Sequence, residues 1–385
     1  MLCKTLSVII IITYMFSNEN PTPDSQLPTP LCDSGQKTKI QAQMLANRVK
    51  KRWKHLHKWA KRLNIEAFRL YDRDIPEIPL VLDLYGDVIS GALYKRPYEK
   101  DPALESIWIK SMREALSQSA GIAPENIIIK QRERQAGLAQ YQKVAEKGLF
   151  REIREGKYKF KVNLSDYLDT GLFLDRRALR NMVGADANGK RALNLFCYTG
   201  SFSVYAAGDG AVSVDSVDLS NTYLAWAQEN FALNGLQAKQ FRMEEFFAQR
   251  VSAGPGPQSL IPSPHLIRAD VNVFLERAIA EGCRWDSIIL DPPAFSNSKM
   301  ARADFDLERD YMSLLADCLA LLAPGGKLWF SASARSFRTS AEELEMALGG
   351  RFPGVKAADI TDKIVDEDFK GKKAPKTILL CCISS

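Results

Sequence analysis

Apolar runs alternate with helical patterns from about residue 165 onward. We predict strands at 192–197, 213–218, 265–269, 287–290 and 327–331, with helical periodicity between them over stretches such as 222–233 and 305–322. Strand and helix in alternation favour a mostly parallel sheet with helices on both faces. The sequence therefore predicts an α/β domain over 166–385. A stretch with two glycines and four prolines, 251–264, interrupts it as a surface insertion.

Shorter apolar alternations precede this domain. The stretches 79–84 and 126–130 indicate strands, and 103–119 has a helical pattern. We therefore predict a small α+β domain over 65–165. Residues 41–64 form an amphipathic helix ahead of it, and residues 1–40 an extension and linker.

The segment that contains the predicted helix 41–64 accounts for the net positive charge of the chain. The formal net charge is +6, yet ten Lys or Arg and no acidic residue lie between Asp33 and Glu66, so the remainder is net negative. A one-sided cationic helix indicates contact with a polyanion, and the alternative is a solvated helix face. The residues that we predict to make this contact are Arg48, Lys50, Lys51, Arg52, Lys54 and Lys58.

The small domain contains a second basic set, which includes Arg132, Arg134 and Lys143. Phosphate contact is the interpretation that we favour for these residues, and a solvated loop is the alternative.

The N-terminus and the cysteines indicate the cellular compartment. Lys4 and the apolar run 6–16 resemble a short signal-peptide core, but the run is too short to span a bilayer and no small-residue cleavage site follows. We expect an over-extended start with Met15 as the true initiator. Seven sparsely spaced cysteines without CxxC pairs or partnering histidines predict reduced thiols and no zinc site or other metal. We predict a cytoplasmic protein that is not associated with membranes.

Residues at the ends of successive predicted strands carry the candidate chemistry. The first strand runs through a tight turn at Gly200 into a helix, so that backbone N–H groups can approach a ligand closely. The residues of this segment that we predict to contact the ligand are Asn194, Phe196, Tyr198, Thr199 and Gly200.

Two aspartates follow the next strands. Asp218 ends the second strand, where a carboxylate can accept hydrogen bonds from ribose hydroxyls. Asp270 follows the third strand, in a position that suits an adenine amino group. For both residues the alternative is a cap of the following helix. Such acids along one sheet edge predict a cofactor that contains adenosine.

The fourth strand ends in Asp291-Pro292-Pro293. Two prolines stop the strand and stiffen the loop, which offers Asp291 and Phe295 to the reactive end of the cofactor. The alternatives are a simple strand stop and, for Phe295, a core aromatic under the loop. We predict Asp291, Pro292, Pro293 and Phe295 as the catalytic wall.

The order of these features resembles class I S-adenosylmethionine-dependent methyltransferases, with their Rossmann-like fold. Residues 46–383 are similar to one family, the bacterial 23S ribosomal RNA guanine-N7 methyltransferases that form the K half of the bifunctional enzyme K/L. The distinctive segments are Tyr-Leu-Asp-Thr-Gly at 167–171 and Phe-Ser-Asn-Ser-Lys at 295–299.

The resemblance implies S-adenosylmethionine as the cofactor. Thr170, Asp175 and Arg176 would close over its methionine end. The implied partner is 23S ribosomal RNA or an assembling large subunit, and Lys299 would join the basic residues in contacting RNA. Two features depart from the family: the guanine-N2 half is absent, and the 251–264 insertion precedes Asp270.

The sequence also bears on which atom is methylated. Cytosine C5 methylation needs a cysteine nucleophile, which similar C5 enzymes carry after the fifth strand; segment 330–337 contains none. Guanine N7 has a lone pair and no proton, so positioning and electrostatics suffice. The resemblance implies N7. An exocyclic amine, guanine N2 or adenine N6, and a non-catalytic role in ribosome assembly stay as alternatives, and the oligomeric state is open.

Overall fold

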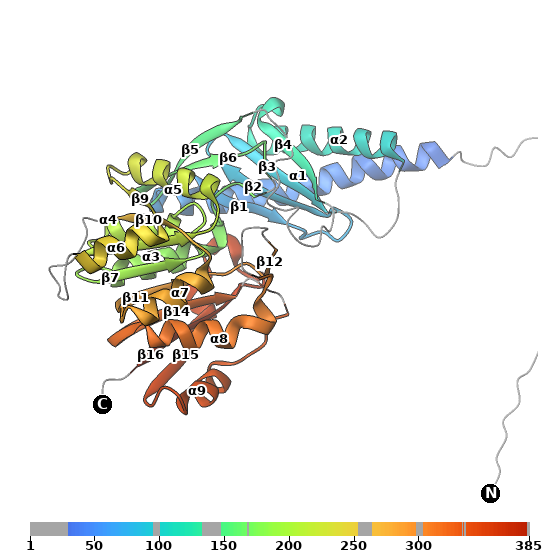
Figure 1. Ribbon diagram of the computed structural model, residues 1–385. Coiled ribbons are helices and arrows are strands. Elements are labelled where there is room, and N and C mark those ends of the chain that lie inside the picture. Colours follow the sequence, from blue (N-terminus) through green and yellow to red (C-terminus); the bar gives the residue numbers. More distant parts are fainter. Residues whose placement is uncertain are drawn as a thin grey trace, which may run out of the picture.

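A small α+β domain packs against a larger α/β domain in the computed structural model of the chain (Figure 1). The structure describes residues 30–94, 101–132, 148–167, 169–252, 264–297, 303–332, 334 and 336–382, without the side chains of 30–34, 132, 251 and 252. Several predictions of RNA contact lie outside these limits. They concern Arg134, Lys143, Lys299 and the side chain of Arg132.

Two long helices lie side by side in the small domain, α1 (Pro30–Leu63) and α2 (Pro102–Ala120) (Figure 1). Trp108 of α2 donates from Nε1 to Oε1 of Gln41 at 2.6 Å, which joins the two helices. Helix α1 begins at Pro30, ahead of the predicted start at residue 41. Proline is tolerated in a first helical turn, and residues 30–40 lack the apolar periodicity that would mark them as helical.

The two helices cover a four-stranded sheet, and apolar side chains from both layers form one core. The strand order is β1-β2-β3-β4, with β3 and β4 parallel because α2 forms the crossover between them. The strands are β1 (Ala67–Asp72), β2 (Leu80–Tyr85), β3 (Val88–Tyr94) and β4 (Ile127–Arg132).

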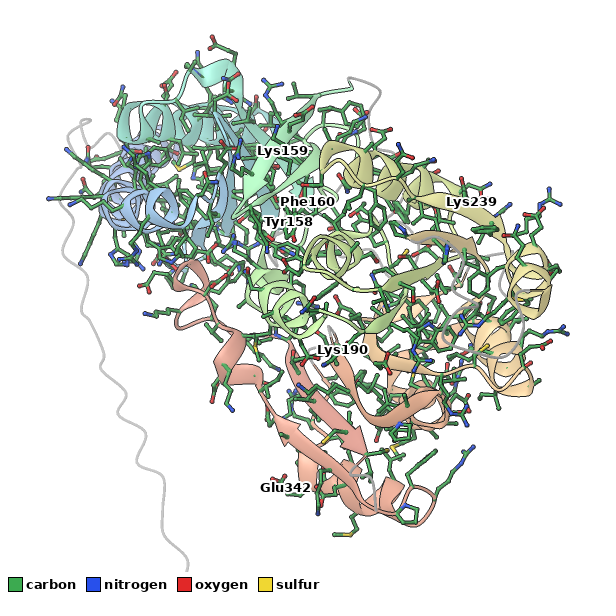
Figure 2. The ribbon with its side chains drawn as sticks, turned by 90° about the vertical axis from the view of Figure 1, so that its left-hand side faces the viewer. Tyr158, Lys159, Phe160, Lys190, Lys239 and Glu342 are labelled. Carbon is green, nitrogen blue, oxygen red and sulfur yellow. The ribbon has the colours of Figure 1, made fainter. Side chains whose placement is uncertain are left out.

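A separate hairpin, β5 (Phe150–Glu155) and β6 (Tyr158–Asn163), lies at the junction of the domains. Its apolar face packs against helices of the large domain, so that Phe160 stacks on Tyr205 with ring centroids 6.1 Å apart. Figure 2 shows Tyr158 and Phe160 at this junction. The hairpin thus packs with the large domain, although the domain boundary that we predicted places it in the small one.

The large domain is built on an eight-stranded sheet in the order β15-β16-β14-β11-β7-β8-β10-β9. Strand β16 is antiparallel to both neighbours, and the other described pairs are parallel, as the alternating pattern predicted. The strands are β7 (Arg191–Leu195), β8 (Ser213–Asp218), β9 (Lys239–Arg242), β10 (His265–Arg268), β11 (Trp285–Leu290), β14 (Leu322–Ala332), β15 (Val355–Asp359) and β16 (Lys376–Cys382).

Helices cover both faces of this sheet. Alternate strand residues face opposite sides, so Leu193 and Leu195 join one core while Ala192 joins another. On the side of Leu193 lie α6 (Met243–Ser252), α7 (Val271–Ala280), α8 (Leu307–Ala320) and α9 (Ala341–Gly349). On the other side lie α3 (Arg177–Asp186), α4 (Ser201–Gly208) and α5 (Asn221–Leu233).

A buried ionic cluster joins the two domains. Arg180 of α3 donates two hydrogen bonds of 2.8 Å to Glu155 of the hairpin, and Arg177 contacts both Glu155 and Asp368. Asp368 in turn accepts from the backbone N–H of Arg69 in β1. The carboxylates and guanidinium groups are almost wholly buried, so each depends on its partners for compensation of charge.

Within the described ranges no helix is long and apolar enough to cross a membrane. The same residues contain no cluster of His, Cys, Asp or Glu arranged to hold a metal ion.

Candidate active site

Strand ends meet at one edge of the large sheet. Leu195 of β7 is in register with Leu290 of β11 on one side and with Val217 of β8 on the other. The chain leaves β7 toward β8 and later returns to the opposite side, so β7 and β11 flank the switch point where α/β sheets bind ligands. The residues that follow these strand ends are therefore neighbours, namely Phe196, Asp218 and Asp291.

The loop after β7 has an unusual backbone. Phe196, Tyr198 and Gly200 all have positive φ, at 54°, 52° and 73°. Such angles cost about 1–3 kcal/mol at each non-glycine residue and are typical of functional loops. A Cβ at position 200 would lie 2.9 Å from Cβ of Ala227 in α5, so only glycine fits this turn.

Two residues of the same segment lie inside the protein. Asn194 is 1% exposed and donates from Nδ2 to Oγ of Ser203 at 2.8 Å. Thr199 is equally buried, and its Oγ1 donates to the carbonyl of Gly171 at 2.6 Å. Their side chains hold the loop from within, which differs from the direct ligand contact that we predicted for them.

Asp218 lies at the end of β8 and organises the neighbouring backbone. Its Oδ2 accepts from the N–H of Tyr198 and its Oδ1 from the N–H of Ser220, both at 2.9 Å. Burial raises the pKa of Asp218 to about 6, although these hydrogen bonds act in the opposite direction. The cap of α5 is Ser220, which accepts from Tyr223 N–H, so the capping alternative does not apply to Asp218.

Asp270 caps the helix that follows it. Its Oδ1 accepts from the N–H groups of Asn272 and Val273 at 2.9 and 3.3 Å. The capping alternative therefore applies here, and any contact with adenine would be an additional role.

Arg176 and Asp291 form the central ion pair of the edge. Arg176 lies 3% exposed at the start of α3, and its Nε is 3.0 Å from Oδ2 of Asp291. A second bond joins Nη2 to Oδ1 at 3.1 Å, while Nη1 is 3.0 Å from Oδ2 of Asp175. Because burial alone would lower the pKa of Arg176, the two acids outweigh it and raise the pKa.

The segment 169–175 lies between this edge and the small domain. Oγ1 of Thr170 is 2.7 Å from the hydroxyl of Tyr85 in β2, and the Phe173 ring is 5.4 Å from that of Tyr198. A cleft of about 190 Å³ opens beside it, with Thr170, Asp175 and Tyr85 in its wall. Burial lowers the pKa of Lys130, also in this wall, to about 8. The small domain thus closes over the segment.

The loop after β11 presents an exposed aromatic ring. Pro292 is buried and Pro293 half-buried, whereas Phe295 is 36% exposed. Phe295 begins the short strand β12 (Phe295–Ser296), which pairs with β13 (Phe305–Asp306). The ring is therefore accessible for stacking and is not a core aromatic.

Fewer of the basic residues of α1 are available for RNA contact than predicted. Lys50, Lys51, Lys54 and Lys58 are exposed. Arg52 instead donates to the carbonyls of Leu70, Arg69 and Asp368, and Arg48 pairs with Asp74 at 2.7 Å. These two arginines attach α1 to the rest of the protein, so the polyanion contact that we predicted for Arg52 conflicts with its position.

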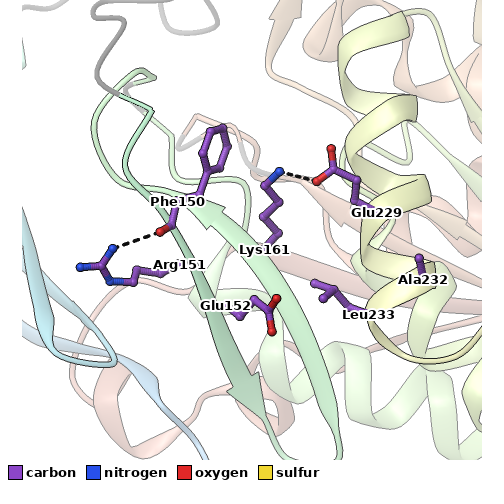
Figure 3. A pocket seen from close by; sticks show the side chains of 7 residues that line it. All are labelled: Phe150, Arg151, Glu152, Lys161, Glu229, Ala232 and Leu233. Atoms are coloured by element: carbon purple, nitrogen blue, oxygen red, sulfur yellow. Dashed lines mark hydrogen bonds and ion pairs between the residues drawn. The ribbon is translucent and has the colours of Figure 1, made fainter.

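A shallow groove of about 560 Å³ lies between the β5–β6 hairpin and α5 (Figure 3). Lys161 points across it to Glu229, with which it pairs, and its Nζ lies 4.2 Å from the centroid of the Phe150 ring. The groove also contains Arg151 and Glu152, so its charges are balanced. It shares no residue with the strand-end edge.

Sequence reasoning missed some residues of the site. Tyr85 comes from the small domain, and no local pattern connects it with Thr170. Ser331 follows Phe330, which is in register with Leu290, so it lies beside Asp291. Its Oγ is buried and has no hydrogen-bond partner. A serine within an apolar strand is too common a pattern to have indicated this position.

Comparison with known proteins adds the family. A model of the S-adenosylmethionine-dependent methyltransferase family matches residues 74–252. The ribosomal RNA large subunit methyltransferase K of Neisseria meningitidis serogroup B is 45% identical over 328 residues, which cover 85% of this chain and 84% of that protein. The K/L methyltransferase of Pseudomonas fluorescens is 41% identical over 352 residues, which cover 91% of this chain and 42% of that protein. The chain thus spans well under half of the K/L relative.

Solved structures show the same fold. A candidate methyltransferase complexed with SAH superposes with a TM-score of 0.63 at 23% identity, covering 89% of this chain and 81% of that one. A candidate SAM-dependent methyltransferase from Streptococcus mutans gives a TM-score of 0.62 at 22% identity, with coverages of 88% and 81%.

Proposed function

This chain belongs to the family of the large-subunit ribosomal RNA methyltransferase K, an S-adenosylmethionine-dependent enzyme family, and we propose that it methylates N7 of a guanine in 23S ribosomal RNA. The observation that carries the proposal is the pairing of Arg176 with Asp291, four residues ahead of the exposed ring of Phe295. It places a fixed carboxylate and a stacking surface at the switch point of the sheet.

The strand-end residues fit S-adenosylmethionine. Both oxygens of Asp218 accept a backbone N–H, and the carboxylate has about four lone-pair sites, which leaves acceptor capacity for a ribose hydroxyl. The loop with positive φ at Phe196, Tyr198 and Gly200 lets the main chain approach the ligand. Asp175 and Arg176, which pair with each other and connect to Asp291, are the residues that we propose for the methionine end.

The bound cofactor supplies an electrophilic methyl group, and the protein supplies position. Guanine N7 attacks with its own lone pair, so no side chain has to remove a proton. Phe295 stacks with the guanine and holds the ring in plane with the line of attack. Methyl transfer to N7 in this proposal therefore requires neither a cysteine nucleophile nor a general base.

Asp291 orients the acceptor through hydrogen bonding. Arg176 compensates much of its charge, so the carboxylate acts as a fixed acceptor more than as an isolated negative charge. The methylated guanine becomes cationic, and the remaining negative potential of the carboxylate favours that product.

Four exposed lysines of α1 supply phosphate contact in this proposal. Lys50, Lys54 and Lys58 are spaced four residues apart, and Lys51 adjoins them, so they present one cationic surface. The partner is 23S ribosomal RNA, free or in an assembling large subunit, in the cytoplasm.

Methyl transfer can be tested directly. Unmodified 23S ribosomal RNA is incubated with the protein and labelled cofactor, and the product is mapped by mass spectrometry and by cleavage specific for 7-methylguanine. We expect one labelled guanine at N7. Label on cytosine or on an exocyclic amine would contradict the N7 assignment. Absence of cofactor binding in calorimetry would support the assembly role instead.

A further inference from the structure

Buried polar atoms without partners point to an additional residue of the acceptor site. In the described part of the chain six buried side-chain nitrogen or oxygen atoms have no hydrogen-bond partner: Arg113 Nε, Arg176 Nη1, Arg177 Nε, Asp186 Oδ2, Asn297 Oδ1 and Ser331 Oγ. Those of Arg176, Arg177 and Asp186 belong to ion pairs. Of the other three, one belongs to Asn297, in the loop that begins at Asp291, and one to Ser331, which lies beside Asp291.

Asn297 is placed to share a ligand with Phe295. It directly follows β12, and alternate residues of an extended segment point to the same side. The Phe295 ring is exposed two residues earlier in the chain, while Oδ1 of Asn297 is buried and has no hydrogen-bond partner. A base stacked on the ring would therefore bring one edge toward the amide oxygen.

A buried oxygen without a hydrogen-bond partner favours a ligand that carries a hydrogen-bond donor. When N7 of guanine faces the methyl donor, the opposite edge of the base carries the N1–H and the N2 amino group. Adenine has no donor at either place, since its N1 is an acceptor and its C2 bears only hydrogen. A site that leaves an acceptor unpaired with the wrong base discriminates strongly.

We propose that Asn297 is a specificity residue, whose Oδ1 accepts a hydrogen bond from the N2 amino group of the acceptor guanine. The inference rests on the proposed function, because it assumes that a guanine stacks on Phe295 with N7 toward the methyl donor. The role is one of selection, and Asn297 takes no part in breaking or forming the methyl bond.

Inosine supplies the test, since it retains N7 and N1–H but lacks the N2 amino group. After the methylated position has been mapped, RNA fragments with guanine or inosine there are compared by kcat/KM. We expect the unmodified protein to prefer guanine about 10- to 100-fold, as is typical when a buried polar atom loses its partner. In Asn297→Ala the activity on guanine falls by a similar factor, and the preference drops to about 1.

Two further variants sharpen the result. Asn297→Asp retains an acceptor oxygen and is expected to keep the preference for guanine, whereas loss of the preference would contradict an acceptor role. Ser296→Ala, in the same strand, should behave as the unmodified protein. Cofactor affinity by calorimetry should not change in any variant.

The outcomes separate this inference from the proposed function. If the unmodified protein transfers methyl to guanine N7 but Asn297→Ala keeps the full preference over inosine, the inference is wrong and the function stands. If the unmodified protein methylates neither fragment at N7, the function is wrong and the inference falls with it.

Discussion

The guanidinium of Arg176 donates three hydrogen bonds to the carboxylate of Asp291, from Nε to Oδ1 at 3.2 Å and to Oδ2 at 3.0 Å, and from Nη2 to Oδ1 at 3.1 Å. From the sequence these residues had separate predicted roles, at the methionine end of the cofactor and at the acceptor wall. Their contact couples the two halves of the proposed site, because the segment that we propose to close over the cofactor also holds the loop that we propose to bind the acceptor.

Replacement of Arg176 should damage turnover through Asp291. Arg176→Lys removes the two-pronged geometry, and we expect kcat to fall about 100-fold while the protein stays folded. Steady-state kinetics on 23S ribosomal RNA measures this. Arg191→Lys is the matched control, because Arg191 of β7 pairs with Asp286 of β11 at the other end of these strands, away from Asp291. Equal losses in both variants would contradict a specific role of Arg176.

Cofactor affinity should depend on the ionisation of Asp218. Burial raises its pKa to about 6, and ribose hydroxyls bind the charged form. The apparent Kd should therefore be constant above pH 7 and rise about tenfold by pH 5. Because the pKa of Asp218 is raised in the folded protein, this group contributes stability at low pH, and the contribution is lost as pH rises through 6. Titration of Asp218 therefore does not unfold the protein at pH 5.

Calorimetry between pH 5 and 8 provides the measurement for Asp218. Asp218→Asn should bind weakly with a flat pH profile, and Asp218→Ala should also bind weakly. If the cofactor affinity of Asp218→Asn still decreases as the pH is lowered below 6, the titration belongs to another group.

Phe295 should act on the acceptor and leave the cofactor unaffected. Phe295→Ala removes the stacking surface, which is worth about 1–3 kcal/mol per base, so kcat/KM for RNA should fall about 10- to 100-fold at unchanged cofactor Kd. Phe150→Ala is the control, since Phe150 is similarly exposed in the separate groove. Weakened cofactor binding in Phe295→Ala would mean that the two subsites are exchanged.

Glu155 should dominate the stability of the domain junction. Burial raises the pKa of Glu155, but the adjacent guanidinium groups of Arg180 and Arg177 outweigh it and lower the pKa below its usual value. Glu155→Gln removes the carboxylate that pairs with the buried guanidinium of Arg180, which should cost about 3–5 kcal/mol in urea unfolding. Glu152 is an exposed residue of the same strand, and Glu152→Gln is the control. This variant should change the free energy of unfolding by less than about 0.5 kcal/mol.

The α1 lysines should set the salt dependence of RNA binding. Replacing Lys50, Lys54 and Lys58 by Gln should reduce the slope of log K against log salt by about 2 to 3, since each phosphate contact contributes about 0.7–0.9. Three exposed lysines of the large domain, Lys239, Lys356 and Lys363, serve as the matched control. An unchanged slope in the α1 variant would place the RNA contact elsewhere.

The fold of the large domain could be predicted closely from the sequence. The predicted strand 213–218 is β8, and the predicted helix 222–233 is α5 apart from its first residue, because alternating apolar runs and turn residues report local structure directly. The strand-end position of Asp218 and Asp291 also followed from the pattern. Strand β9 was missed, since its four residues include one buried side chain, Phe241, and give no period.

Other outcomes depended on long-range contacts. The sequence could not distinguish capping from ligand contact at Asp218 and Asp270, and the structure shows a cap only at the second. It could not foresee that Arg52 is used inside the protein, because its partners Leu70 and Asp368 are far along the chain.

The sequence by itself therefore determined the order of strands and helices, the acids at the strand ends and the basic character of α1. These depend on residues close together in the chain. Only the tertiary structure decided that Arg176 holds Asp291, that Asn194 and Thr199 lie inside, and that Phe295 stays exposed. The positions of Arg176, Asn194 and Thr199 depend on how a charged or polar group is compensated when folding buries it. The local sequence pattern around Arg176 cannot indicate a partner that lies 115 residues away.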